Sequence, residues 1–226
     1  SLEGFRRSVS IYRQQGDNQN VAVGLRALAK LYKRLGQYAE ALNSISQALE
    51  TISESQDPLL AAKLRMDLAL IHRAQGDLNT ALADFRDATN ILRMKRAGRE
   101  YEGLMLFQVG SVYFNSGRYT EAKRYFESAL KISQALGDRV SENYLYVFLI
   151  RTNLNSMTPD QRVKSLPRLQ QSYEQIARRF RESAHRTGEA FLWTEIGKMY
   201  ENRGNLKKAE EMYGTAVGLD ESSLGE

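Results

Sequence analysis

The apolar positions of this chain recur with the period of an amphipathic helix and are interrupted by single glycines. Between Glu189 and Gly218 the apolar side chains fall mostly three or four residues apart. That spacing places them on one face of a helix with 3.6 residues per turn. Gly204 interrupts the run, and glycine accepts the left-handed backbone that a helix needs beyond its last turn. The pattern predicts two short helices joined by a turn.

Small residues occupy the positions where these two helices would cross. Gly197 lies in the first helix, and Ala209 and Ala216 lie in the second. A large side chain at any of the three would hold the two backbones apart. We therefore expect the helices to pack closely against each other.

The same pattern occurs upstream with a period of 40 or 41 residues. The aromatic position of the second helix, Tyr213, has equivalents at Phe5, Ile45, Phe85 and Phe126, at successive intervals of 40, 40 and 41 residues. A fixed period of this length is the mark of a repeat architecture. The turn glycines and the alanines that lie four residues before the aromatic position keep the same period: Gly36, Gly76 and Gly117, and Ala41, Ala81 and Ala122.

The order bulky, small, aromatic, glycine, alanine, aromatic, alanine resembles the tetratricopeptide-repeat family. This resemblance implies an all-α fold, a right-handed superhelical stack of helix-turn-helix repeats whose first helices line a concave groove. It also implies a binding scaffold. A period of 40 residues, longer than the common ~34, resembles the arrays of cell-polarity adaptors, kinesin light chains, bacterial peptide-sensing regulators and segments preceding caspase-like protease domains.

We expect a single array over residues 1–226. Its first segment matches only the second helix of a repeat, which suggests a fragment of a longer array. The predicted boundaries are 1–17 for the truncated repeat, 18–57, 58–97 and 98–138 for three full repeats, 139–187 for a degenerate repeat, and 188–220 for the last repeat.

The degenerate repeat has an insertion near residues 155–168. Thr158 and Pro159 predict a helix start there, with threonine as the cap and proline in the first turn. Asp57 and Pro58 predict another start by the same logic. Pro167 is expected to break or kink the inserted helix, because proline has no N–H to donate and clashes with the preceding turn.

Composition narrows the function classes. The 226 residues include no cysteine, so a disulfide framework and a cysteine-based metal site or nucleophile are excluded. No apolar run is long enough to span a bilayer, no signal peptide is evident, and a cytoplasmic location is expected. The net charge of +5 favours acidic partners.

The faces of the first helices that point away from their own partner helix would line the groove. This surface begins basic, becomes apolar and aromatic, and ends mixed. We expect a protein or peptide partner with acidic and bulky apolar residues, because arginine pairs with carboxylates and an aromatic pocket anchors large side chains. The apolar members could instead pack between repeats. The candidates are Arg26, Lys30, Lys33, Lys63, Met66, Arg73, Phe107, Ser111, Phe114, Arg151 and Lys198.

Two other functions remain open. The array could assemble with further copies or with neighbouring repeats of a longer chain, or it could contact nucleic acid through the arginine-rich degenerate repeat. Aromatic residues are not interleaved with those arginines, which argues against base stacking. The predicted basic patch comprises Arg162, Lys164, Arg168, Arg178, Arg179 and Arg181.

Catalysis is not expected. No nucleophile motif or phosphate-binding glycine loop is present, and no cofactor or metal is predicted. His72 stands where other repeats have tyrosine, so it is expected to be a core histidine with a satisfied hydrogen bond. His185 has no companion at ligand spacing. The family's clamp for two carboxylates is also not expected, because Asp67 stands at one of its positions and would repel a carboxylate.

Overall fold

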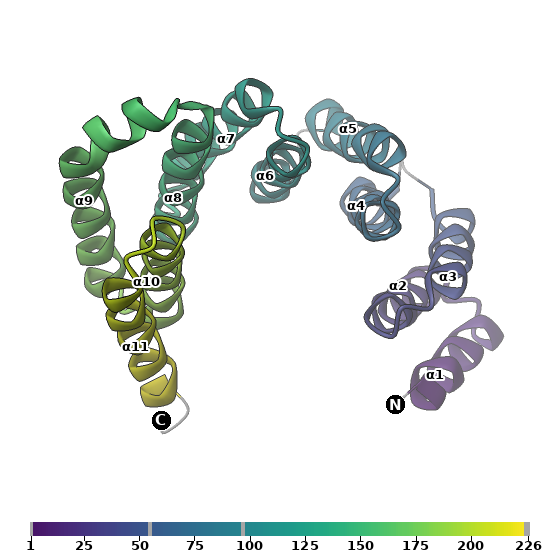
Figure 1. Ribbon diagram of the computed structural model, residues 1–226. Helices are drawn as coiled ribbons and strands as arrows, with labels where there is room; N and C mark the ends of the chain where they lie inside the picture. Colours follow the sequence, from purple (N-terminus) through teal and green to yellow (C-terminus); the bar gives the residue numbers. More distant parts are fainter. Residues whose placement is uncertain (1, 54–55, 96–97, 224–226) are drawn as a thin grey trace. The chain divides into compact units, whose positions relative to one another are not determined.

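The computed structural model describes residues 2–53, 56–95 and 98–223 of the chain. Every regular element within these ranges is a helix (Figure 1), and the predicted all-α repeat fold is confirmed. The chain divides into two compact units, Ser1–Ser116 and Gly117–Glu226. The boundary falls between the two helices of the predicted repeat 98–138.

The first unit contains α1 to α6. Each helix packs against the next in the chain, and the first helices of successive pairs also touch, α2 with α4 and α4 with α6. This arrangement places three first helices next to one another. Their bounds, with those of the intervening helices, are α1 Leu2–Gln14, α2 Asn18–Arg34, α3 Tyr38–Thr51, α4 Pro58–Ala74, α5 Leu78–Lys95 and α6 Arg99–Asn115.

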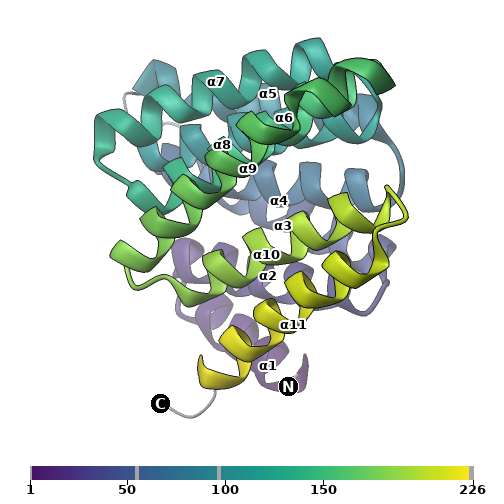
Figure 2. The same cartoon turned by 60° about the vertical axis from the view of Figure 1, so that its left-hand side comes forward.

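The second unit contains α7 to α11 and follows the same plan. Consecutive helices pack together, and α8 also touches α10. Figure 2 shows α10 and α11 side by side and joined by a turn, as the pattern of their apolar positions predicts. The bounds are α7 Tyr119–Leu136, α8 Arg139–Ser156, α9 Pro159–Glu182, α10 Arg186–Glu201 and α11 Leu206–Ser223.

Short polar side chains start the first helices. Asp17, Asp57 and Asp138 each accept a hydrogen bond from the backbone N–H three residues later, at 2.9 to 3.0 Å. These bonds satisfy a backbone donor that has no partner within the helix. Thr158 caps α9 in the same way and forms a reciprocal capping box with Gln161. The predicted helix starts at Asp57 and Thr158 are therefore confirmed.

Left-handed residues end the helices at the turns. Gly36, Gly76 and Gly204 have φ values of 73°, 86° and 73°, as the turn pattern predicts. The link between α9 and α10 is different, because Ala184 adopts a left-handed φ of 51° where links such as α2–α3, α4–α5 and α10–α11 use glycine. L-residues other than glycine pay a steric cost in this region.

The interior of each helix pair is built from the periodic apolar positions. Ile45, Phe85 and Phe126, which share one position in the repeat, have no exposed surface. At Gly197 an added Cβ would lie 2.5 Å from the ring of Tyr213. The close crossing of α10 and α11 predicted from the small residues is therefore confirmed.

Helix α9 accommodates the inserted residues of the degenerate repeat. It is 24 residues long, and its helical backbone continues through Pro167. Of the two expected outcomes, a break does not occur, and the ribbon of α9 bends in its N-terminal part in Figure 1, as a kink would require. A proline removes one N–H donor but leaves the flanking hydrogen bonds intact, so a long helix can bend there and continue.

Candidate protein-binding surfaces

The basic end of the predicted groove contains a buried carboxylate on α4. Asp67, whose side chain is only 6% exposed, accepts a hydrogen bond from Arg26 Nε at 2.5 Å. Lys30 Nζ lies 3.7 Å from the same oxygen, Oδ2, and its side chain is about half exposed. A buried charge is stable only when it is paired, so Asp67 ties Arg26 of α2 to α4. Arg26 is thus engaged within the fold, whereas Lys30 remains at the surface.

Two further cations of this surface are partly removed from water. Burial lowers the pKa of Lys33; Asp67 acts in the opposite direction, and Arg73 and Lys30 add to the lowering. Burial also lowers the pKa of Arg73. The Arg73 guanidinium donates from Nη1 to Gln108 Oε1 at 2.6 Å, which links α4 to α6. An incoming carboxylate would compensate the charge of these partly buried cations and would offset their mutual repulsion.

The other predicted residues of the first unit differ in accessibility. Lys63 Nζ lies 4.2 Å from the centroid of the Tyr101 ring, a cation–π contact at the surface between α4 and α6. Met66 is only 6% exposed and belongs to the interior. Ser111 Oγ donates to the backbone oxygen of Phe107. Three members are partly buried along one face of α6: Phe107, Ser111 and Phe114.

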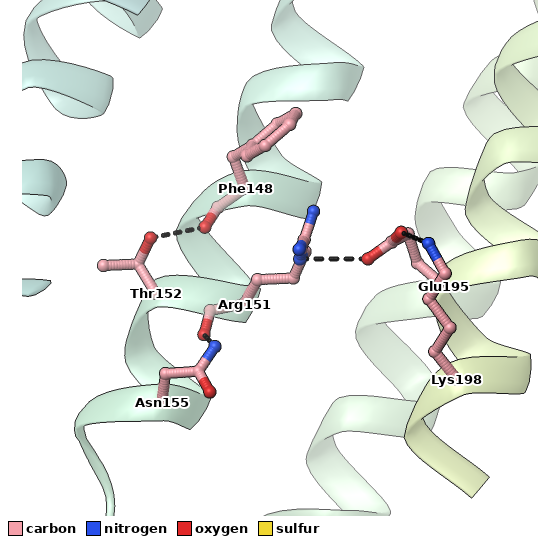
Figure 3. Close-up of polar contacts among 6 residues, drawn as sticks. All are labelled: Phe148, Arg151, Thr152, Asn155, Glu195 and Lys198. Atoms are coloured by element: carbon pink, nitrogen blue, oxygen red, sulfur yellow. Dashed lines mark hydrogen bonds and ion pairs between the residues drawn. The ribbon is translucent and has the colours of Figure 1, made fainter. Parts of the chain in front are cut away.

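In the second unit, Arg151 of α8 and Lys198 of α10 meet at one carboxylate (Figure 3). Glu195, 6% exposed, pairs through Oε2 with Arg151 Nε and through Oε1 with Lys198 Nζ, both at 2.9 Å. The Arg151 guanidinium also lies 5.2 Å from the centroid of the Phe148 ring. The structure thus brings these two predicted residues together and links adjacent first helices through a buried acid.

An aromatic cluster adjoins Arg151. The rings of Phe148 and Phe191 are stacked with centroids 6.1 Å apart, and Tyr144 lies 5.3 Å from Phe191. All three are partly buried. Their contacts join α8 to α10, so they hold successive first helices together.

The predicted basic patch on α9 is only partly formed. Arg162 donates to two backbone carbonyls at the end of α8. Arg181 pairs with buried Glu189 of α10 at 2.6 Å, and Arg179 pairs with Glu142 of α8 at 3.3 Å. These three arginines hold α9 to its neighbours. The remaining members are exposed: Lys164, Arg168 and Arg178.

The two histidines have structural roles. His72 Nδ1 lies 2.7 Å from Asp84 Oδ2, so the expectation of a satisfied histidine is confirmed. His185 Nδ1 accepts a hydrogen bond from Gly188 N at the start of α10. Within the ranges that the structure describes, no group of three histidine or acidic side chains could hold a metal ion.

Sequence reasoning missed the central role of Asp67 and Glu195. The sequence indicates Asp67 only as an acid that would repel a carboxylate, and it gives no sign by itself that Glu195 is buried between two cations. The signal lay in the repeat period, because Arg26 and Asp67 are 41 residues apart and so occupy nearly the same position on adjacent first helices. Opposite charges one period apart predict ion pairs between repeats.

Comparison with known sequences agrees with this architecture. A tetratricopeptide-repeat profile matches residues 25–94 and 59–135, and a second one matches residues 192–223. Together these ranges cover more than half of the chain. The chain belongs to the tetratricopeptide-repeat family. The matched ranges of this tetratricopeptide-repeat protein leave out the whole of the degenerate repeat, residues 139–187.

Solved structures share the fold at low sequence identity. BtubC (BKLC) from P. vanneervenii is 18% identical, with a TM-score of 0.77 over 100% of this chain and 91% of that chain. The apo form of RapI is 17% identical, with a TM-score of 0.70 over 100% and 78%. The Rap conjugation gene regulator of plasmid pLS20, in complex with the Phr* peptide, is 16% identical, with a TM-score of 0.59 over 97% and 70%.

No curated protein sequence matches this tetratricopeptide-repeat chain. Among the described residues, no helix combines the length and the apolar character required to cross a bilayer.

Proposed function

We propose that this protein is a non-catalytic interaction scaffold that binds an acidic peptide or partner segment across the first helices α2, α4 and α6. Tetratricopeptide repeats serve generally as non-enzymatic interaction scaffolds. The structurally similar Rap regulator was solved with a bound peptide. Both points support a peptide or protein as the partner.

The observation that carries this proposal is an excess of positive charge on one surface. Arg26 pairs with the carboxylate of Asp67 at 2.5 Å and Lys30 lies 3.7 Å from it, while Lys33 is acted on by Asp67, Lys30 and Arg73. Partial burial then lowers the pKa of Lys33. A surface that crowds desolvated cations is poorly arranged for stability but well arranged to receive carboxylates.

Apolar groups beside these cations suggest a second feature of the ligand. Phe107 and Phe114 lie on the next first helix, α6, partly buried and three to four residues from Ser111. Aromatic surface next to charge favours a ligand that combines acidic with bulky apolar side chains. A peptide lying along successive first helices would reach both.

Selection of peptides on the immobilised chain tests the proposal. Random nine-residue peptides displayed on phage should be enriched in acidic and bulky apolar residues. The test variant removes three lysines of α2 and α4, Lys30→Gln, Lys33→Gln and Lys63→Gln, and should bind a selected peptide at least tenfold more weakly. The control variant carries the same charge change on exposed lysines of α7 and α11: Lys123→Gln, Lys131→Gln and Lys207→Gln.

The outcomes separate the alternatives. Equal loss in both variants would indicate attraction to net charge alone and would contradict the proposal. Binding that is blind to sequence and falls steeply with salt would instead favour a nucleic-acid surface. A mass that rises with protein concentration, without peptide selection, would favour self-assembly.

A further inference from the structure

A hollow on the second unit lies between α9, α10 and α11, and nothing in the proposed function uses it. Its volume is about 280 Å³. Three aromatic side chains, Tyr173, Trp193 and Tyr200, line it together with two methionines. Glu174 and Glu211 supply carboxylates at its wall, and Lys208 supplies one ammonium group. The volume is at the lower limit for ligand sites and suits one long side chain.

A second hollow, between α1, α2 and α3 of the first unit, occupies the equivalent place in the repeat. Seven of its lining residues have counterparts in the α9–α11 hollow that lie 168 residues later in every case. Tyr32 corresponds to Tyr200, and Arg6 corresponds to Glu174. The two hollows are therefore the same structural feature with different side chains.

The α1–α3 hollow contains a cation from the chain itself. Arg6 donates from Nη2 to the hydroxyl of Tyr32 at 2.6 Å, and its guanidinium carbon lies 6.0 Å from the centroid of that ring. This contact shows which group the feature accepts. A guanidinium enters from the preceding second helix and contacts the hydroxyl end of the aromatic residue of the following first helix.

The α9–α11 hollow lacks that guanidinium and carries extra groups that would attract one. Glu174 stands in place of Arg6, Glu211 in place of Asn43, and Trp193 in place of Leu25. Lys208 Nζ lies 5.3 Å from the Tyr200 ring centroid, so one ring already contacts a cation. The indole N–H of Trp193 donates to Glu189 at 3.2 Å, which fixes the ring that lines the hollow.

The charge of the hollow is set by its carboxylates. Burial and the nearby Glu195 raise the pKa of Tyr173 to about 12, so its phenol is neutral near pH 7. Among the lining residues, two glutamates and one lysine leave a net negative charge, on a chain whose net charge is +5, while Glu195, Arg151 and Arg203 act on Tyr173 from outside the lining. Local negative charge beside an indole suits arginine, which pairs with carboxylates and stacks on aromatic faces.

We propose that the α9–α11 hollow is a second binding site, which receives an arginine side chain of a partner peptide. The guanidinium lies on Trp193 and pairs with Glu211. Arg6 occupies the equivalent hollow differently, through the hydroxyl of Tyr32, because that hollow has Leu25 and Asn43 in place of Trp193 and Glu211. This site is independent of the acidic-peptide surface on the first unit. It gives the protein two sites that prefer ligands of opposite charge.

Trp193 provides the assay, because it is the only tryptophan of the chain. Nα-acetyl-arginine methylamide is titrated into the full chain at constant ionic strength, and the Trp193 emission and the NMR signal of its indole N–H are followed. Both should change and saturate. The citrulline analogue has nearly the same shape without the charge and should bind at least fivefold more weakly.

Three variants locate the site. Glu211→Gln should weaken binding of the arginine probe about three- to tenfold. Its control, Glu210→Gln, makes the same charge change on the same helix outside the hollow and should leave binding unchanged. Lys208→Met removes the competing ammonium and should strengthen binding several-fold.

Three results would each overturn the proposal. The first is the absence of any saturable change in both Trp193 signals with the arginine probe. The second is equal binding of the arginine and citrulline probes, which would indicate an apolar contact. The third is an equal effect of Glu211→Gln and Glu210→Gln on binding, which would indicate a nonspecific contact. A far-UV circular dichroism spectrum and a Tm equal to those of the wild type would show that Glu211→Gln remains folded.

Discussion

The turn at Ala184 should be a point of backbone strain that a glycine relieves. Its φ of 51° lies in the left-handed region, where an L-residue costs about 1–2 kcal/mol. Ala184→Gly removes this cost, but glycine loses about 0.4–1 kcal/mol through the greater freedom of the unfolded chain. We therefore expect a net gain of about 0.5–1 kcal/mol in the free energy of unfolding.

The reciprocal substitution is a matched control in the same unit. Gly137 has a φ of 68° in the turn between α7 and α8, and a Cβ added there would have no heavy atom within 4 Å outside its immediate chain neighbours. Gly137→Ala therefore changes backbone strain without a steric clash. It should lose about as much stability as Ala184→Gly gains.

Thermal unfolding followed by circular dichroism measures both effects. For a chain of this length 1 kcal/mol shifts Tm by roughly 2–4 °C, so Ala184→Gly should raise Tm by about 1–4 °C. Gly137→Ala should lower it, and the double variant should return close to wild type. A lower Tm for Ala184→Gly would refute the argument, because it would mean that the left-handed turn carries no strain.

Three further substitutions test other parts of the fold. Ala122→Leu adds an isopropyl group at a position with no exposed surface and should lower the free energy of unfolding in urea by about 1–3 kcal/mol; an unchanged midpoint would contradict the helix crossing. The Nδ2 of Asn143 is buried and has no hydrogen-bond partner in the described ranges, and the equivalent positions of two other repeats hold Ala22 and Gly103. Asn143→Ala should therefore raise the free energy of unfolding by up to about 1 kcal/mol. A lower free energy of unfolding would indicate that the amide is hydrogen-bonded. Burial lowers the pKa of Lys33 below its ordinary 10.5. Between the folded and the unfolded pKa the unfolded chain therefore binds more protons, so this group should raise the free energy of unfolding of the wild type as pH rises through that range. Lys33→Gln should lack this rise when urea unfolding at pH 8 and at pH 10.5 is compared.

The helices were predictable because their signals are local. Gly204 ends a helix through its own backbone freedom, and Asp57 caps one through its own side chain. The crossing at Gly197 was predictable for a related reason, since only a small residue allows Tyr213 to approach. Pro167 was harder, because whether a proline breaks or bends a helix depends on the rest of that helix and its packing.

The candidate surfaces were less predictable because pairing between repeats is not local. Arg26 reads as an available cation in the sequence, yet Asp67 of the next repeat engages it. Arg181 reads as part of a basic patch, yet it pairs with buried Glu189. Periodicity indicates which residues face outward, but only side-chain geometry shows which charges remain for a ligand.

The pairing of Arg26 with Asp67 has an evolutionary consequence. A change at Asp67 alone would leave a guanidinium without its counter-charge, and a change at Arg26 alone would leave a buried acid unpaired. Positions 26 and 67 are therefore expected to co-vary in homologous chains. Lys30, which is half exposed, can change on its own. Ligand preference can then diverge through the surface lysines while the Arg–Asp pair keeps the two repeats joined.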